Sequence, residues 1–150
     1  MVIFNKIVFA LPAQKVHAHC DLPCGVYDPA QARIEAQSVY NIMKWYHKAK
    51  DDDGQDRCLI IKEKRAELVK KHLWVLWTDY FKPEHLEKFP NLHDLFWRAT
   101  KAAGDAKRSV DSKDGQKLID LVDEVGKIFE QTKEGYQYQP VADNMNIQAA

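Results

Sequence analysis

The stretch DGQKLIDLVDEVGKIFEQT, residues 114–132, decides the fold of this chain. Its apolar residues recur every three or four positions, so one face of a helix would be apolar and the other polar. The stripe consists of Leu118, Leu121, Val122, Val125, Ile128 and Phe129. We therefore expect an amphipathic helix over about Asp114–Thr132, which needs other helices to cover its apolar face.

Three segments upstream carry similar patterns. We expect helices over about Pro29–Lys48, Arg57–Phe81 and Pro90–Ala103. Asp28 is a good N-cap with proline at the first helical position behind it, and Gly104 is expected to stop the third helix. No strand-like alternation occurs. These patterns predict an all-α fold, an antiparallel four-helix bundle over about residues 29–132.

The segment Arg57–Phe81 carries apolar residues on two sides. One side is the stripe Cys58, Ile61, Leu68, Val69, His72, Val75 and Leu76. The other side holds Trp74, Trp77 and Phe81. A helix with two apolar faces must be covered twice, by its own bundle and by more helices or another subunit, which favours an oligomer. Cys58 fits the stripe as a small apolar residue.

Polar segments separate the helical patterns. Asp51–Asp56 contains a glycine and is expected to be a loop, although it lacks the later ligand positions of a calcium loop. Asp105–Lys113 is expected to be a connection. The tail, residues 133–150, shows no periodicity, and we assign it no role.

Composition limits the possible functions. The 150 residues suit one domain; 45% are hydrophobic, 29% are charged, and the formal net charge is zero. This balance argues against a nucleic-acid or anionic-membrane partner. Three cysteines are too few for a disulfide scaffold, and no apolar run reaches the roughly 20 residues that cross a bilayer.

The bundle is preceded by HCDLPCGVYDP, residues 19–29, which concentrates reactive side chains. Two close thiols with an adjacent histidine indicate a metal site, a disulfide or a redox pair. The histidine favours metal. If the chain were cut before His19, its amine, the next amide nitrogen and the Cys20 and Cys24 sulfurs would form a planar N2S2 set, which suits nickel or copper better than tetrahedral zinc.

The order His-Cys-x-x-Pro-Cys-Gly-x-Tyr, residues 19–27, resembles the nickel hook of nickel-dependent superoxide dismutases. Three further blocks are similar to that family: DPAQARIEA at 28–36, IKEKRAEL at 61–68 and LWTDYFKP at 76–83. The likeness weakens after about Pro90. We therefore identify the chain as a member of this family, with an N-terminal metal-binding hook in front of the bundle.

The resemblance implies one nickel ion per subunit and an enzyme that converts superoxide to oxygen and hydrogen peroxide by Ni(III)/Ni(II) cycling. The ligands would be the His19 amine and imidazole, the Cys20 amide nitrogen, and the Cys20 and Cys24 sulfurs. Strongly donating thiolates and an ionised amide make nickel easier to oxidise. The alternative reading is a nickel-binding storage or chaperone protein without turnover, and another is a secreted helical protein with a Cys20–Cys24 disulfide.

The resemblance also assigns supporting roles. Glu35 and Arg65 both fall on expected core stripes and would pair, orienting the axial imidazole. Tyr27 and Tyr80 would stand beside the metal, order water and restrict access to small anions. Asp21 would secure the hook.

Residues 1–18 are expected to be a propeptide, because only a free amine at His19 can serve as the terminal donor. A processing peptidase would cut before His19 and leave the domain 19–150. The short apolar run and nearby Pro12 make a secretory signal the weaker reading, so we expect a cytoplasmic protein. The resemblance further implies a homohexamer.

Overall fold

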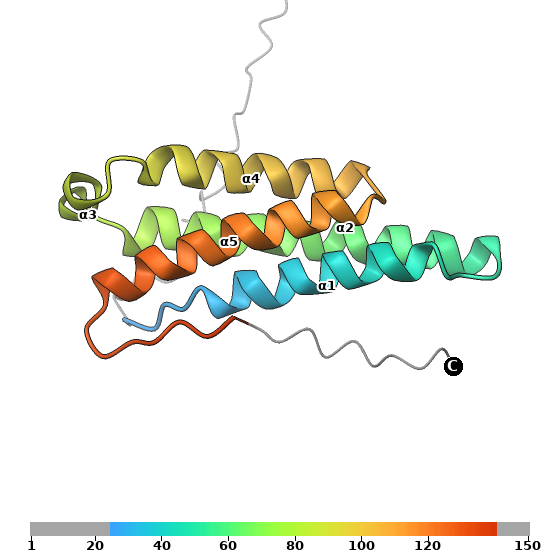
Figure 1. Ribbon diagram of the computed structural model, residues 1–150, viewed down its shortest axis with the longest axis horizontal. Helices are drawn as coiled ribbons and strands as arrows, with labels where there is room; N and C mark the ends of the chain where they lie inside the picture. Colours follow the sequence, from blue (N-terminus) through green and yellow to red (C-terminus); the bar gives the residue numbers. More distant parts are fainter. Residues whose placement is uncertain (1–24, 141–150) are drawn as a thin grey trace, which may run out of the picture.

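The computed structural model describes residues 25–140, which form an antiparallel four-helix bundle (Figure 1). The long helices are α1 (Ala30–Tyr46), α2 (Asp52–Val75), α4 (Leu92–Arg108) and α5 (Ser112–Thr132). A π-helical turn, η1 (Leu76–Tyr80), extends α2, and the short α3 (Pro83–Lys88) links it to α4. Helices α1 and α4 each pack against both α2 and α5. No strand occurs within residues 25–140, and the predicted all-α class is confirmed.

The core lies between the four long helices and is apolar. The α5 stripe predicted from the sequence is buried as expected, and so are Leu92, Leu95, Phe96, Ala99 and Ala103 of α4. On α1 the buried apolar residues are Ala32, Ala36, Val39 and Met43. Small alanine side chains on α1, α2 and α4 let these helices approach closely. The longer apolar side chains of α5 fill the remaining space in the core.

Two expected helix boundaries were wrong. Asp51–Asp56 is not a loop: Asp51 is the N-cap of α2, and its carboxylate accepts a hydrogen bond of 2.8 Å from the Gly54 N–H. Asp52 and Asp53 then fill the first turn, where negative charge interacts favourably with the helix dipole. Gly104 does not stop α4, which continues to Arg108 because Ala106 still buries its side chain in the core.

The buried face of α2 also differs from the predicted stripe. It consists of Lys62, Ala66, Val69 and Leu73. Of the predicted stripe, only Val69 belongs to this face and buried Leu76 of η1 continues it, so the bundle buries a face offset from the expected one. Lys62 is only 1% exposed because its ammonium donates to the carbonyls of Ala106 (2.7 Å) and Lys107 (2.5 Å), at the C-terminal end of α4.

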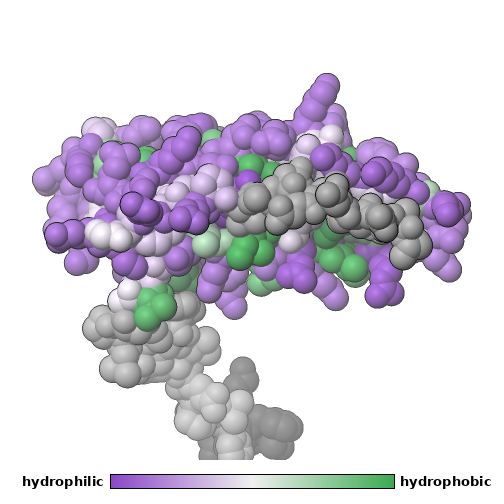
Figure 2. Space-filling view, turned by 60° about the horizontal axis from the view of Figure 1, so that its bottom comes forward, coloured by the Kyte–Doolittle hydropathy of each residue, from purple (hydrophilic) through white to green (hydrophobic). Residues whose placement is uncertain are grey.

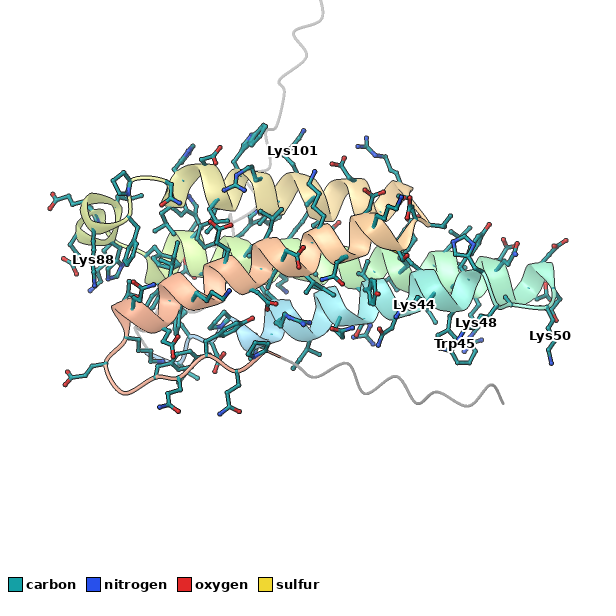
Figure 3. The ribbon with its side chains drawn as sticks, in the orientation of Figure 1. Lys44, Trp45, Lys48, Lys50, Lys88 and Lys101 are labelled. Carbon is teal, nitrogen blue, oxygen red and sulfur yellow. The ribbon has the colours of Figure 1, made fainter. Side chains whose placement is uncertain are left out.

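The surface of the described part is largely polar. Figure 2 shows one face that is mostly hydrophilic, with hydrophobic residues exposed in small separate patches. Lysines lie at both ends of the bundle, with Lys44 and Lys48 near the C-terminal end of α1 and Lys88 in α3 (Figure 3). Within residues 25–140, no helix combines the length and apolarity that a membrane span requires.

Candidate functional site

The described chain enters the bundle through the last residues of the hook. Gly25 has a φ of +69°, a left-handed conformation that favours glycine, so the backbone turns sharply directly after Cys24. Two residues past Val26, the Asp28 carboxylate accepts a hydrogen bond of 2.7 Å from the Ala30 N–H. Asp28 was predicted as the N-cap itself, but the N-cap is Pro29, and Asp28 binds the first helical N–H from one position earlier.

Tyr27 and Tyr80 come together at this end of the bundle. Their ring centroids are 5.7 Å apart, with the planes inclined by 52°. The Tyr80 ring also packs on Phe129 of α5 at 4.3 Å, and its hydroxyl lies 2.9 Å from the Thr132 hydroxyl. The two rings are thus in contact, and their predicted place beside the metal stays a prediction, because the expected ligands lie outside the described residues.

Tyr80 owes its position to the end of the second helix. The π-helical turn η1 closes with a hydrogen bond of 3.0 Å from the Phe81 N–H to the Leu76 carbonyl. This wider turn changes the direction of the side chains that follow it. Phe81 then takes an extended backbone, and Pro83 begins a new helix. The LWTDYFKP block therefore ends the second helix and places the Tyr80 ring against Phe129 of α5.

Glu35 and Arg65 pair across α1 and α2. One guanidinium nitrogen of Arg65, Nη1, lies 3.1 Å from both carboxylate oxygens of Glu35. The expected partnership is therefore present. The expected burial of Arg65 was wrong, because its side chain is 44% exposed while that of Glu35 is 12% exposed. Arg65 lies beside the buried face of α2, one position before Ala66.

The tyrosine pair and the ion pair are separate groups in the described structure. Arg65 and Tyr80 are fifteen residues apart on nearly continuous helix, which corresponds to about 22 Å at 1.5 Å per residue. His19, Cys20, Asp21 and Cys24 lie outside the described residues. Within residues 25–140, no group of three or more His, Cys, Asp or Glu side chains could hold a metal ion.

Three contacts at the base of the hook were not predicted. Lys133 donates from its ammonium to the Tyr27 carbonyl at 3.1 Å, and Tyr136 donates from its hydroxyl to Asp28 at 2.7 Å. Thr132 receives the Tyr80 hydroxyl contact described above. All three residues lie at or beyond the end of the last helix, where helical periodicity gives no signal. The spacing Tyr136-x-Tyr138 was the available clue, because alternate residues of an extended segment share a face.

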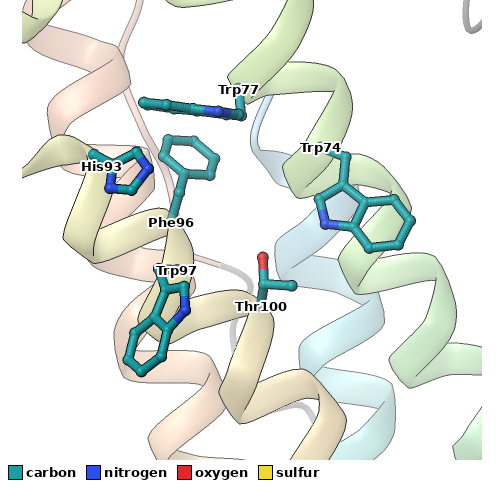
Figure 4. A pocket seen from close by; sticks show the side chains of 6 residues that line it. All are labelled: Trp74, Trp77, His93, Phe96, Trp97 and Thr100. Carbon is teal, nitrogen blue, oxygen red and sulfur yellow. The ribbon is translucent and has the colours of Figure 1, made fainter.

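An aromatic pocket opens on another face of the molecule (Figure 4). It measures about 190 Å³ and lies between the end of α2, η1 and α4. Its walls are formed by Trp74, Trp77, His93, Phe96, Trp97 and Thr100. Ligand pockets for drug-sized molecules usually measure roughly 300–1,000 Å³, so this pocket is small for such a ligand. None of the predicted site residues lines it.

The described residues define a class by their fold: a four-helix bundle whose N-terminal segment meets it at a pair of tyrosine rings. Residues 14–133 match the family described as nickel-containing superoxide dismutase. The chain belongs to the nickel-containing superoxide dismutase family.

Individual relatives agree with this assignment. The nickel superoxide dismutase of Streptomyces seoulensis is 56% identical over 122 residues, covering 81% of this chain and 93% of the relative. The enzyme of Streptomyces coelicolor is 53% identical over the same coverage. A native nickel superoxide dismutase structure matches with a TM-score of 0.75 and 53% identity, covering 78% of this chain and all of that chain.

The family fixes the activity. The chain is an oxidoreductase with a nickel cofactor, and it converts superoxide to oxygen and hydrogen peroxide. Two further solved relatives are described with nickel ligation of the oxidised state and of the state after partial X-ray-induced reduction. Those descriptions apply to the relatives.

Proposed function

We propose that this chain carries out superoxide dismutation at its hook, where His19, Cys20 and Cys24 hold one nickel ion per subunit once residues 1–18 are removed. The donor chemistry fits nickel, because soft thiolates with amine, amide and imidazole nitrogens suit a tetragonal N/S site. Bound nickel supplies the one-electron redox couple that the reaction requires. Relatives solved with nickel ligation of the oxidised state and of a partially reduced state support a redox-active nickel site.

One observation carries the proposal: the described chain leaves Cys24 through a left-handed Gly25 and is then fixed at Tyr27 against Tyr80. The hook therefore starts from a defined point on the bundle. The two rings would stand between the nickel and solvent, where they restrict access to small molecules and order water through their hydroxyls.

Glu35 and Arg65 would orient the His19 imidazole. A histidine that ligates a metal usually donates its other ring N–H to a carboxylate or carbonyl, which fixes its orientation. Glu35 retains acceptor capacity beside its single Arg65 contact, because each carboxylate oxygen has two lone-pair directions. Because this pair lies about 22 Å along the helix from Tyr80, one nickel site cannot adjoin both groups of the same subunit. The Glu35–Arg65 pair that contacts His19 would therefore belong to another subunit of the proposed hexamer.

Asp21 would secure the hook, and the backbone N–H groups of Asp21 and Cys24 would hold the incoming superoxide anion. Lys133 places a positive charge 3.1 Å from the Tyr27 carbonyl, which would favour the approach of an anion. Outside the site, we propose removal of residues 1–18 by a peptidase that cuts before His19. We also propose assembly into a homohexamer and a cytoplasmic location.

The test compares two purified forms of the chain, one starting at His19 and one retaining residues 1–18. Nickel content is measured by mass spectrometry of metals, and superoxide consumption is measured by stopped-flow absorbance. We expect one nickel per chain and rapid consumption only for the trimmed form, because an amide nitrogen cannot replace the terminal amine. Activity in the form with the leader would overturn the proposal, and nickel without turnover would indicate a storage protein.

Cys20→Ser and Cys24→Ser in the trimmed chain test the ligands directly. We expect loss of nickel and activity with unchanged helical content by circular dichroism, since these residues precede the bundle. Nickel binding that survives both substitutions would place the metal elsewhere. Native mass spectrometry of the loaded trimmed chain then tests the assembly, for which we expect a mass of six subunits.

A further inference from the structure

The chain continues past α5 and turns back along the bundle, where it contacts the base of the hook. Gly135 has a φ of +73°, and the Tyr136 N–H donates to the Lys133 carbonyl at 3.2 Å, which closes the turn. The family match ends at residue 133. Residues 134–140 lie past the end of this match, and we call them the C-terminal clamp.

Tyr138 fastens the clamp to the bundle. Its hydroxyl donates to Asp123 at 2.6 Å, and the same carboxylate oxygen accepts from the Arg33 guanidinium at 2.7 Å. Its backbone N–H donates to the Glu130 carboxylate at 3.2 Å. The ring lies so close to Gly126 that a Cβ at that position would overlap it. Residues of α1 and α5 thus form a binding surface that matches the shape and the hydroxyl of this side chain.

Tyr136 contacts Asp28, the residue that directly follows the hook. Its hydroxyl donates to Oδ1 of Asp28 at 2.7 Å, the oxygen that also caps the Ala30 N–H. Its ring packs edge-on against Phe129 with centroids 4.9 Å apart, and Phe129 in turn supports Tyr80. Burial and the hydrogen bond to Asp28 raise the pKa of Tyr136, so its hydroxyl remains a proton donor throughout the neutral range.

We propose that the C-terminal clamp positions the nickel hook, with Tyr136 as the positioning residue that acts through Asp28. Asp28 is four residues from Cys24, so holding Asp28 limits the directions in which the hook leaves the bundle. Lys133 holds the adjacent Tyr27 carbonyl from the same side. The clamp reduces the number of conformations of the empty hook, so less conformational entropy is lost when nickel binds. This inference rests on the hook being the nickel site.

Two matched substitutions test the clamp in the trimmed full chain. Tyr136→Phe removes only the hydroxyl that reaches Asp28 and keeps the ring on Phe129. Tyr138→Phe removes only the hydroxyl that reaches Asp123, in the same segment. If the clamp acts on the hook, Tyr136→Phe releases nickel to a chelator faster, by about threefold to tenfold, the effect of one hydrogen bond of ordinary strength. Tyr138→Phe keeps the ring against Gly126 and the backbone hydrogen bond to Glu130, so the clamp stays attached and the parental rate is retained.

Two readouts separate positioning from general destabilisation. Hydrogen exchange of the metal-free chain should show faster exchange at the Ala30 amide in Tyr136→Phe and parental exchange there in Tyr138→Phe. The electron paramagnetic resonance lines of the oxidised nickel should broaden in Tyr136→Phe, because the ligands occupy a wider range of geometries. Equal nickel release, exchange and spectra in the parent and Tyr136→Phe would overturn the clamp.

The outcomes also distinguish the clamp from the proposed function. If Cys20→Ser and Cys24→Ser keep nickel, the hook is not the metal site, and the link between clamp and metal fails with it. If those variants lose nickel while Tyr136→Phe behaves as the parent in every measurement, the proposed function stands and the clamp alone is wrong.

Discussion

Helices α5 and α2 are both long, yet they contribute to the molecule in different ways. Of the 21 residues of α5, the buried ones are all apolar or glycine, and they form one continuous face. The 24-residue α2 buries only Lys62, Ala66, Val69 and Leu73, and it leaves Ile60 and Trp74 about half exposed. Helix α5 is therefore stabilised mainly by hydrophobic burial inside this chain, whereas α2 relies more on polar contacts and exposes part of its apolar surface.

The largest expected effect concerns α5. Phe129 is fully buried and touches Tyr80, Phe81 and Tyr136, so Phe129→Ala should lower the free energy of unfolding by about 3–5 kcal/mol. Urea unfolding of the trimmed chain, followed by circular dichroism, measures the loss. Ile60→Ala on α2 is the control, with an expected change near zero because that side chain is 57% exposed. Similar losses for both variants would contradict the contrast between the helices.

The second effect concerns the buried polar contact of α2. Lys62→Met keeps the length and apolar part of the side chain but leaves the carbonyls of Ala106 and Lys107 without their donor. We expect a loss of about 1–3 kcal/mol in the free energy of unfolding. Val69→Ala, which shortens a neighbouring buried side chain, provides a cavity reference on the same face.

The stabilisation by Lys62 should depend on pH. Burial lowers the pKa of Lys62, so the unfolded chain holds this proton more tightly than the folded chain. Stability relative to Lys62→Met should therefore rise with pH between the lowered folded pKa and the ordinary value near 10.4. A difference that stays constant from pH 8 to 10.5, or falls, would contradict this assignment.

The fold was largely predictable from the sequence, and the errors have a common cause. The stripes of α4 and α5 were predicted correctly because each helix has a single apolar face. Helix α2 has apolar residues on several sides, so periodicity could not identify the face that the bundle buries. The loop predicted at Asp51–Asp56 followed from counting polar residues, although aspartates are also what a helix N-terminus favours.

Contacts between side chains of two long helices could be predicted from the sequence. Single hydrogen bonds between distant, non-helical residues could not. The pair Glu35–Arg65 was predicted from the family blocks and is present, whereas the contact between the Tyr27 and Tyr80 rings was not predicted. The contact of Tyr136 with Asp28 joins residues 108 positions apart, one of them in a segment without periodicity. A pattern within one helix carries no information on such a contact.

The third effect tests whether the ion pair between α1 and α2 contributes to stability or to nickel binding. Because Arg65 is 44% exposed, Arg65→Met should change the free energy of unfolding by no more than about 1 kcal/mol. The same substitution should affect the rate of nickel release more strongly than it affects stability, because Glu35 loses the partner that fixes its orientation. Arg65→Lys is the control: a single nitrogen of Arg65 makes both contacts, so an ammonium can largely replace it. A destabilisation of several kcal/mol would show a structural role instead.

The smallest effect is expected at the exposed apolar surface of α2. Trp74 is 48% exposed at the edge of the aromatic pocket, so Trp74→Ala should change the free energy of unfolding of the isolated subunit by less than about 0.5 kcal/mol. Phe96→Ala, in the same pocket but 4% exposed, should cost about 3–5 kcal/mol. The two residues differ mainly in burial, so the pair measures how much of this pocket belongs to the core. Equal losses at dilutions where only single subunits are present would show that Trp74 contributes to the core despite its exposure.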